Sequence, residues 1–314
     1  MSALSLSSLP QRIKLCEVGP RDGLQNEATP LSAADKVRYI DLLSASGLSL
    51  IEASSFVRAD RMPQLGDADE VFAQIERRPG TTYLALVPNR KGLERARAAG
   101  VRAIAVFTAA SEAFAHANIG MTIAESLRVF ADVVREARAD GMWIRGYVST
   151  AFGCPYEGRV PVESVVRVAS ALADLGIDEL SIGDTIGVAT PNQVVEVCAA
   201  LQAELPVERL AMHFHDTRGT ALANVLAALQ MQIAIFDSSS AGLGGCPYAP
   251  GASGNLATED LLYLLDGMGI ESGVDLTAVR AASRFVLHAL GRAPASRVYL
   301  ALDAQESSPR KLER

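Results

Sequence analysis

The feature that most constrains the fold of this chain is a regular alternation of short apolar runs with longer amphipathic stretches. The short runs are rich in β-branched residues, which favours buried strands, and the stretches between them have helical spacing. Strands that alternate with helices pair in parallel. Eight such units predict a closed (β/α)8 barrel, the TIM-barrel fold. The predicted strands span residues 13–18, 50–54, 82–87, 103–108, 144–150, 179–183, 210–215 and 233–238.

Residues that start helices stand at the predicted helix ends. Ser32, with Asp35 three residues later, resembles a capping box. Pro191 follows Thr190 as a first helical residue follows its N-cap. No GxGxxG or GxxxxGK[ST] motif opens any unit, which argues against an open nucleotide-binding sheet.

Length and composition indicate one large enzyme-sized domain. The chain has 314 residues, 49% of them hydrophobic, and α/β barrels of this size commonly stand as one domain. We expect an N-terminal segment at 1–12, the barrel domain at 13–300 and a flexible tail at 301–314. An additional C-terminal helix is predicted at about 275–290.

Charge and cysteine usage narrow the partners and the compartment. The net charge is −7, with no basic block, which argues against nucleic acid as the main partner. No apolar run reaches the ~18 residues of a membrane span. Four cysteines without CxxC spacing favour a reducing compartment. We therefore expect a cytoplasmic enzyme with neither a nucleic-acid nor a membrane partner.

Polar side chains gather where the first two predicted strands end. Arg21 and Asp22 stand side by side after the first strand, and Glu52 lies among apolar residues in the second. An unpaired carboxylate inside the barrel would be costly, so Arg21 is its natural partner. The guanidinium fork can bind Glu52 on one side and a developing oxyanion on the other. A turn with a salt bridge and a purely structural ion pair are the alternatives.

The seventh predicted strand carries the pair His213 and His215. Residues two apart on a strand share a face, so both imidazoles point the same way at the carboxyl end, where TIM barrels place their chemistry. We interpret them as metal ligands, the alternative being satisfied core histidines. Asp22 and Asn255 would add oxygen ligands. This set suits Mg²⁺ or Mn²⁺, although zinc hydrolases also use the HxH pattern.

A loop rich in glycine follows the eighth predicted strand, with Gly-Leu-Gly-Gly-Cys-Pro-Tyr at 242–248. Glycines let the backbone approach a ligand and adopt positive φ, and long ordered loops in compact domains are usually functional. The loop holds a single thiol, Cys246, and a single amide, Asn255. We expect it to face the polar residues at the other strand ends.

Other polar residues give weaker signals. Ser181 lies on the sixth predicted strand and Asp184 directly after it; both could contact a substrate hydroxyl or carboxylate, but a β–α turn with a cap is an equal alternative. Cys154 is interpreted as structural. His116 and His288 have no partner pattern and are not expected to bind a metal.

Three stretches carry a family resemblance: Pro-Arg-Asp-Gly-Leu-Gln-Asn-Glu at 20–27, His-Phe-His-Asp-Thr at 213–217, and the stretch 242–260. Together they resemble 3-hydroxy-3-methylglutaryl-CoA (HMG-CoA) lyase, a member of the DRE-TIM metallolyase group. The resemblance covers about 14–290. Arg-Asp-Gly alone indicates only the wider group, which includes isopropylmalate and homocitrate synthases. The Gly-Leu-Gly-Gly-Cys-Pro-Tyr loop is more specific to the lyase.

The resemblance implies a role for each matching residue. Asp22, His213, His215 and Asn255 would be the metal ligands. Arg21 would stabilise an enolate, Glu52 would orient Arg21, and Cys246 would lie on a mobile catalytic loop. Residues implied to line or support the substrate site are Gln25, Ser55, Asn118, Ser181, Asp184 and Glu259.

The implied reaction is retro-aldol cleavage of (S)-3-hydroxy-3-methylglutaryl-CoA to acetyl-CoA and acetoacetate, in leucine degradation or ketone-body metabolism. An acyl-CoA substrate and a homo-oligomeric state, a dimer, belong to the same expectation. Ala28 stands where many relatives carry lysine, and the run from Arg58 to Arg61 replaces Ser-Pro-Lys-Trp. Rival readings are a lyase for a related 3-hydroxy-3-alkylglutaryl-CoA, as in isoprenoid catabolism, a condensing synthase, or a non-catalytic metal-binding barrel.

Overall fold

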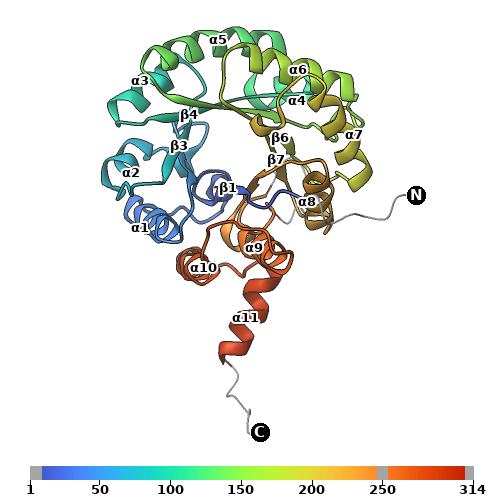
Figure 1. Cartoon of the computed structure of the whole chain (residues 1–314). Helices are drawn as coiled ribbons and strands as arrows, with labels where there is room; N and C mark the ends of the chain where they lie inside the picture. The colour runs from blue at the N-terminus through green and yellow to red at the C-terminus, as the bar shows by residue number, and fades with distance from the viewer. Residues whose placement is uncertain (1–8, 246–253, 308–314) are drawn as a thin grey trace, which may run out of the picture.

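The computed structural model describes residues 9–245 and 254–307, and its centre is a closed barrel of parallel strands (Figure 1). Each strand pairs with its neighbour in sequence, and β1 closes the ring by pairing with β8 over four residues, from Lys14 opposite Ile235 to Glu17 opposite Ser238. The strands are β1 Lys14–Glu17, β2 Leu50–Ser55, β3 Thr82–Leu86, β4 Ala103–Ala109, β5 Trp143–Ser149, β6 Glu179–Asp184, β7 Leu210–Phe214 and β8 Ile235–Ser238. The predicted TIM-barrel fold is confirmed.

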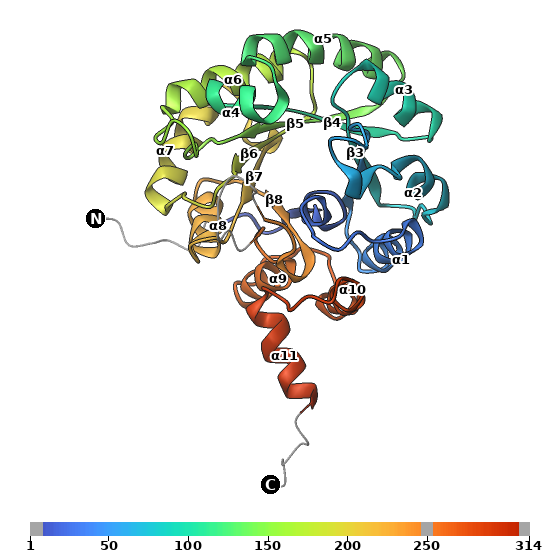
Figure 2. The same ribbon diagram turned by 180° about the vertical axis from the view of Figure 1, so that it is seen from behind.

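Helices connect the strands and form an outer ring around the barrel, as both views show (Figures 1 and 2). The helices between strands are α1 Ala33–Ser44, α2 Ala68–Gln74, α3 Arg90–Ala98, α4 Glu112–Ile119, α5 Ile123–Ala139, α6 Val162–Asp174, α7 Pro191–Gln202 and α8 Ala221–Gln230. After β8 come α9 Thr258–Gly267, α10 Leu276–Leu290 and α11 Arg297–Ser307. Short turns are the π-helical η2 Gly19–Gly23 and the 3-10 turns η3 Pro63–Leu65, η4 Val207–Arg209 and η5 Ser240–Gly242.

The predicted helix starts are present. The side chain of Ser32 accepts a hydrogen bond from the backbone N–H of Asp35 at the start of α1. Thr190 and Gln193 form a capping box at the start of α7, with Pro191 as the first helical residue. These caps satisfy backbone N–H groups that the first helical turn leaves unpaired.

The C-terminal region contains more helix than the sequence predicted. The additional helix expected at 275–290 is α10, and α11 continues to Ser307, across the boundary at 300 where we expected a flexible tail. Figure 1 shows α11 extending away from the helical ring. The apolar residues of 297–307 are grouped in its first half and give only weak amphipathic spacing, so the sequence pattern did not reveal this helix. Residues 1–8, 246–253 and 308–314 lie outside the described part of the chain.

Apolar residues form two layers, one between strands and helices and a smaller one inside the barrel. Alternation along β1 shows the division, because Leu15 belongs to the outer layer and Cys16 to the inner one. The inner layer also encloses charge: Arg145 is completely buried. Its guanidinium donates to Glu179 on β6 and to Asp237 on β8, at 2.7 and 2.6 Å, so that a buried ion cluster ties three strands together.

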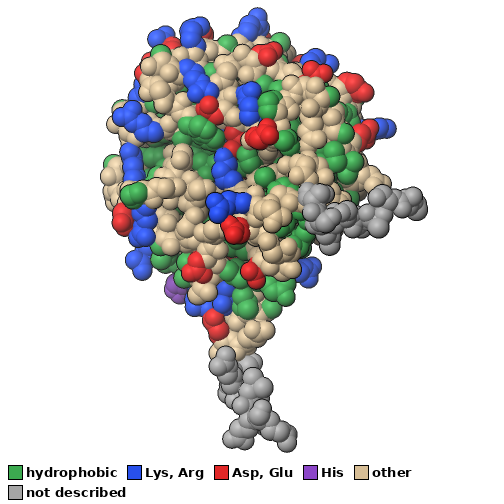
Figure 3. All heavy atoms as spheres, in the orientation of Figure 1, with side chains coloured by type: hydrophobic (Ala, Val, Ile, Leu, Met, Phe, Trp, Pro, Cys, Tyr) green, Lys and Arg blue, Asp and Glu red, His purple; other side chains and the backbone are tan. Residues whose placement is uncertain are grey.

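Among the described residues no helix has the length and apolar character needed to cross a membrane. The face in Figure 3 carries acidic and basic side chains intermixed with hydrophobic ones.

Candidate metal and catalytic site

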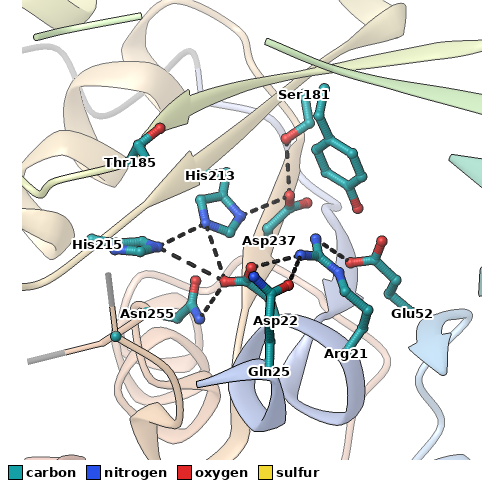
Figure 4. Close-up of polar contacts among 12 residues, drawn as sticks. Arg21, Asp22, Gln25, Glu52, Ser181, Thr185, His213, His215, Asp237 and Asn255 are labelled. Atoms are coloured by element: carbon teal, nitrogen blue, oxygen red, sulfur yellow. Dashed lines mark hydrogen bonds and ion pairs between the residues drawn. The ribbon is translucent and has the colours of Figure 1, made fainter. Parts of the chain in front are cut away.

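Three predicted ligands from two distant parts of the chain converge at one end of the barrel. Asp22 lies in η2, directly after β1, while His213 lies on β7 and His215 just beyond it. The Nε2 atoms of the two imidazoles are 3.1 Å apart, and each is 3.9 Å from Oδ2 of Asp22. One ligand atom from each residue lies within 4.8 Å of the others, close enough to hold a single metal ion. Figure 4 shows the three side chains pointing toward one another.

Asn255 completes this group from the segment between β8 and α9. Its Nδ2 donates to Oδ2 of Asp22 at 2.9 Å and to the carbonyl of Leu243 at 3.0 Å. Its Oδ1 is buried and accepts no hydrogen bond from the described residues. A buried oxygen without a donor is costly, and a cation bound beside it would remove that cost. The donor set of imidazole nitrogens and carboxylate and amide oxygens therefore fits a divalent ion of the Mg²⁺ or Mn²⁺ type.

The electrostatics of the site favour a bound cation. Burial disfavours the ionised form of Asp22, but Arg21 and the two histidines outweigh it and lower its pKa to about 2. Burial and the neighbouring His213 lower the pKa of His215 to about 4. At neutral pH the site therefore presents a carboxylate and at least one neutral imidazole, the forms that bind metal.

Arg21 lies beside this group and is held by three acceptors. Its guanidinium contacts Glu52 at 2.6 Å, Oδ1 of Asp22 at 2.7 Å and Oε1 of Gln25 at 3.3 Å. The predicted Arg21–Glu52 ion pair is confirmed, with Glu52 completely buried. Burial raises the pKa of Glu52, although Arg21 opposes that effect. Tyr147 lies under the guanidinium, 5.6 Å from its carbon to the ring centre.

The glycine-rich loop begins at a turn that two buried carboxylates hold. Glu17 accepts hydrogen bonds from the backbone N–H groups of Gly19 and Ser240, at 2.9 and 2.8 Å. Glu259 accepts from the N–H of Ala241, whose φ of +60° is in the left-handed region. Gly244 follows with φ +110°, and a Cβ there would lie 2.5 Å from the amide nitrogen of Asn255. This glycine is therefore required for the close approach of the loop to the site.

The remaining predicted residues differ in how near they lie to this centre. Gln25 contacts Arg21, and Ser181 donates to Asp237 at 2.9 Å. Ser55 is buried and accepts from a backbone N–H two residues later.

Asp184 caps the turn after β6 by accepting from the N–H groups of Val188 and Ala189, which is the structural alternative considered for it. Glu259 supports the loop base, and Asn118 is an exposed residue of α4. Cys246, the predicted catalytic thiol, lies outside the described residues. Cys154 is buried and accepts a hydrogen bond from the Ser111 hydroxyl at 3.0 Å, consistent with a structural role.

Sequence reasoning missed Asp237, Arg145 and Glu17. Each is a charged residue within a buried strand, at a position whose neighbours in sequence are mostly apolar. Period-2 alternation could have assigned Asp237 and Arg145 to the barrel interior. Their partners, however, lie on other strands and are not visible in local sequence.

Comparison with known proteins gives this site a family. A family model described as HMGL-like matches residues 12–286. The chain belongs to the HMGL-like family. This HMGL-like chain is 51% identical over 298 residues to the 3-hydroxy-3-isohexenylglutaryl-CoA/hydroxy-methylglutaryl-CoA lyase of Pseudomonas aeruginosa, with 95% of the chain and 99% of the relative covered. It is 50% identical to the mitochondrial hydroxymethylglutaryl-CoA lyase of Pongo abelii, with 95% and 92% covered.

Solved structures of family members superpose closely on this HMGL-like chain. Hydroxymethylglutaryl-CoA lyase from Pseudomonas aeruginosa matches with a TM-score of 0.93 at 52% identity, over 95% of the chain and 99% of that structure. An HMG-CoA lyase from Acinetobacter baumannii, in complex with coenzyme A and 3-methylmalate, matches with a TM-score of 0.89 at 37% identity, over 100% and 99%. The resemblance inferred from the sequence motifs is thus confirmed.

Proposed function

We propose that this chain is a divalent-metal-dependent HMG-CoA lyase, which cleaves (S)-3-hydroxy-3-methylglutaryl-CoA to acetyl-CoA and acetoacetate. The observation that carries the proposal is the convergence of Asp22, His213 and His215 next to the Arg21–Glu52 ion pair. A cation-binding group beside a buried guanidinium suits a reaction that produces an enolate. Relatives at about 50% identity carry the name of this lyase.

In this proposal Asp22, His213, His215 and Asn255 hold Mg²⁺ or Mn²⁺. When bound, such an ion supplies Lewis acidity that lowers the pKa of a substrate hydroxyl and a template for hydroxyl and carboxylate oxygens. Asp22 and His213 are the two candidates to accept the hydroxyl proton, and Asp22 is favoured, because a His213 that binds the ion through Nε2 and donates from Nδ1 to Asp237 has no free lone pair. The carbon–carbon bond then breaks, with its electron pair moving toward the thioester.

Arg21 meets the negative charge that develops on the enolate oxygen. Glu52 fixes the guanidinium before the reaction begins, so that little reorganisation is needed, and preorganised stabilisation of this kind is usually the largest catalytic contribution. In this proposal Cys246, which lies outside the described residues, donates a proton to the enolate carbon. A protonated thiol is required for this step, in contrast to an activated nucleophilic thiolate.

A second candidate substrate is 3-hydroxy-3-isohexenylglutaryl-CoA. The Pseudomonas aeruginosa relative carries both substrates in its name. The segment from Arg58 to Arg61 departs from the family pattern; the structure places Arg58 in an exposed ion pair with Asp60 at 2.7 Å. These departures affect the region where we expect the acyl-CoA to approach, not the group around Asp22.

Cleavage assays separate the candidates. The purified protein is treated with EDTA, and acetoacetate is measured by a coupled assay before and after Mg²⁺ or Mn²⁺ is added. We expect no cleavage without metal and recovery with it. We then measure kcat/KM for a panel of 3-hydroxyglutaryl-CoA thioesters that carry a methyl, an isohexenyl or a straight-chain alkyl group at carbon 3, and rank the substrates by this value. Equal activity with and without metal contradicts the mechanism, and no cleavage of any thioester favours a non-catalytic barrel.

A further inference from the structure

The ring of His213 is held on its far side by a carboxylate that the proposed mechanism does not use. Nδ1 of His213 lies 3.1 Å from Oδ2 of Asp237, while its Nε2 faces Asp22 and His215 (Figure 4). Asp237 is the third residue of β8 and is only 2% exposed. Because a carboxylate can only accept a hydrogen bond, this contact requires the proton of a neutral His213 to be on Nδ1.

Asp237 is itself fixed by donors from two other strands. Arg145 on β5 donates from Nη2 to Oδ1 at 2.6 Å, and Ser181 on β6 donates to Oδ2 at 2.9 Å. Arg145 and Ser181 are completely buried, and the guanidinium of Arg145 forms a close ion pair with the carboxylate, which favours its charged form. The carboxylate is therefore charged and rigid. His215 has no equivalent support, since its Nδ1 is buried with no hydrogen-bond partner among the described residues.

We propose that Asp237 is a positioning residue for the metal site: it holds His213 with the proton on Nδ1 and the Nε2 lone pair directed at the metal, and Arg145 orients Asp237. The inference rests on the proposed function only in requiring that the site binds a divalent ion. Partners of this kind orient ligating histidines, and losing one typically costs 10–100-fold in metal affinity.

The variant Asp237→Asn tests the proposal sharply because of Arg145. The guanidinium offers only donors, so the amide oxygen of the variant must face Arg145 and the amide NH₂ group must face His213. That NH₂ group needs an acceptor, which favours the His213 tautomer with its proton on Nε2. The proton then occupies the lone pair that the metal needs. The substitution keeps the size of the side chain and changes the direction of the two hydrogen bonds at Oδ2, those with His213 and Ser181; the Ser181 hydroxyl can rotate to accept, whereas the His213 ring must change its tautomer.

A matched control is Glu179→Gln. Glu179 is the other carboxylate bound to Arg145, at 2.7 Å, and it is as deeply buried as Asp237. Its other cationic partner is Lys14, at the opposite end of the barrel interior from His213. If Asp237 served only to neutralise Arg145, the two variants would behave alike. If Asp237 positions His213, only Asp237→Asn will affect metal binding.

The first measurement is Mn²⁺ affinity, by titrating EDTA-treated protein and following free Mn²⁺ by EPR. We expect Asp237→Asn to bind Mn²⁺ about 10–100-fold more weakly and Glu179→Gln to stay within about threefold of wild type. Wild-type affinity in Asp237→Asn, or an equal loss in both variants, overturns the proposal. Because this readout does not use cleavage, a wild-type protein that binds Mn²⁺ but cleaves no thioester refutes the proposed function alone.

The second measurement does not use Asp237→Asn and therefore remains possible if that variant fails to fold. The chain has four histidines, so ¹⁵N-histidine labelling gives few ring signals, and comparison with His213→Gln assigns the one of interest. In wild-type protein saturated with diamagnetic Mg²⁺, we expect a proton on Nδ1 of His213 and none on Nε2. A ring without a proton on Nδ1 overturns the proposal.

Discussion

Arg21 contacts a proposed metal ligand, Asp22, and is also the residue that we propose to stabilise the enolate. Its guanidinium shares donors among Glu52, Asp22 and Gln25, and it lies over Tyr147. Glu52 is completely buried, so removing Arg21 would leave a buried carboxylate without its cation. The arginine is therefore fixed in place before substrate binds, which is the condition for preorganised charge stabilisation.

Replacing Arg21 tests its role in the reaction. Arg21→Gln should lower kcat by about three orders of magnitude or more, because loss of one oxyanion donor alone typically costs ~10²–10³. Mn²⁺ affinity should change little. Steady-state acetoacetate formation and Mn²⁺ titration give the two values. Arg12→Gln is the control, since Arg12 is 80% exposed in an ion pair with Glu271. Activity of Arg21→Gln within tenfold of wild type would refute the enolate role.

His215 makes a separate prediction about the metal ligands. His215→Ala removes one of three ligand atoms that lie within 4.8 Å of each other, so Mn²⁺ affinity should fall by about 100-fold or more, beyond the usual effect of a supporting residue. His288→Ala, which changes an exposed histidine of α10, should bind Mn²⁺ like wild type. Equal affinities in the two variants would exclude His215 as a ligand.

At the scale of single residues, the sequence predicted those features of the site that depend on the spacing of neighbouring residues. His213 and His215 were predicted to face one way because strand alternation has period two, and Arg21 was paired with Glu52 because a buried carboxylate needs a cation. Asp237 was not identified, because its role depends on a contact with Arg145, which lies 92 positions earlier in the chain. A contact of that kind requires the strand register, which single-sequence patterns do not give.

At the scale of elements, the turn η5 connects the barrel to the glycine-rich loop. Its backbone N–H groups at Ser240 and Ala241 bind the carboxylates of Glu17 and Glu259. The same Glu17 binds the N–H of Gly19 at the start of η2, which carries Arg21. One buried carboxylate thus sets the distance between the turn that carries the arginine and the start of the loop that carries Cys246.

This arrangement predicts a pH-dependent contribution to stability. Burial raises the pKa of Glu17 from 4.5 to about 7, although three hydrogen bonds oppose it. Between these values the folded chain binds the proton more tightly than the unfolded chain, so the contribution of Glu17 to stability is full below about pH 4.5 and falls as the pH rises to about 7. Wild type should therefore lose Tm relative to Glu17→Gln between pH 5 and pH 8.

Calorimetry of both proteins across this range measures the difference. A Tm difference that is constant with pH, or one that moves in the opposite direction, would show that Glu17 does not titrate with the raised pKa.

The sequence predicted the regular elements better than the turns between them. Strand and helix positions follow from apolar periodicity, and Ser32 and Thr190 mark helix starts through local hydrogen bonds. The π-helical turn η2 depends on Glu17, which also binds Ser240, 223 positions away. No local pattern specifies this arrangement, because Glu17, two residues before the turn, is itself bound by a backbone N–H from the other end of the chain.

At the scale of the whole molecule, the site joins the two ends of the barrel sequence. The proposed metal ligands come from the turn after β1, from β7 and its end, and from the segment after β8. Asn255 donates to Asp22 across 233 positions, next to the β1–β8 pairing that closes the ring. A cation bound here would therefore link three segments that lie far apart in the sequence: the turn after β1, the end of β7 and the segment after β8.

Metal binding should therefore stabilise the folded barrel. An ion that binds only the folded chain contributes RT ln(1 + [L]/Kd), about 2.7 kcal/mol at a hundred times Kd. We expect Tm to rise by a few degrees when Mn²⁺ is added to EDTA-treated protein, measured by calorimetry. His215→Ala should show almost no rise. A rise of equal size in both proteins would mean that the ion stabilises the fold from another place.

The fold class could be predicted because eight consecutive strand–helix units can form few compact arrangements other than a closed barrel. The motifs of the HMGL-like family also fall at the ends of the predicted strands. Helix α11 was not predicted, because the apolar residues through which it packs on α9 show little helical periodicity in the sequence. At the start of α11, the backbone N–H groups of Arg297 and Val298 donate hydrogen bonds to the carboxylate of Asp260 on α9, at 3.2 and 2.8 Å. This cap is again a long-range one.

The closure of the ring by β1 and β8 has a consequence for biosynthesis. A ribosome releases Asp22 early, the two histidines much later, and Asn255 only after β8 has been made. A polypeptide terminated before β8 contains a carboxylate and both imidazoles but lacks the strand that brings the first turn beside the seventh strand. The cation site that we propose would therefore be complete only in a chain translated through Asn255.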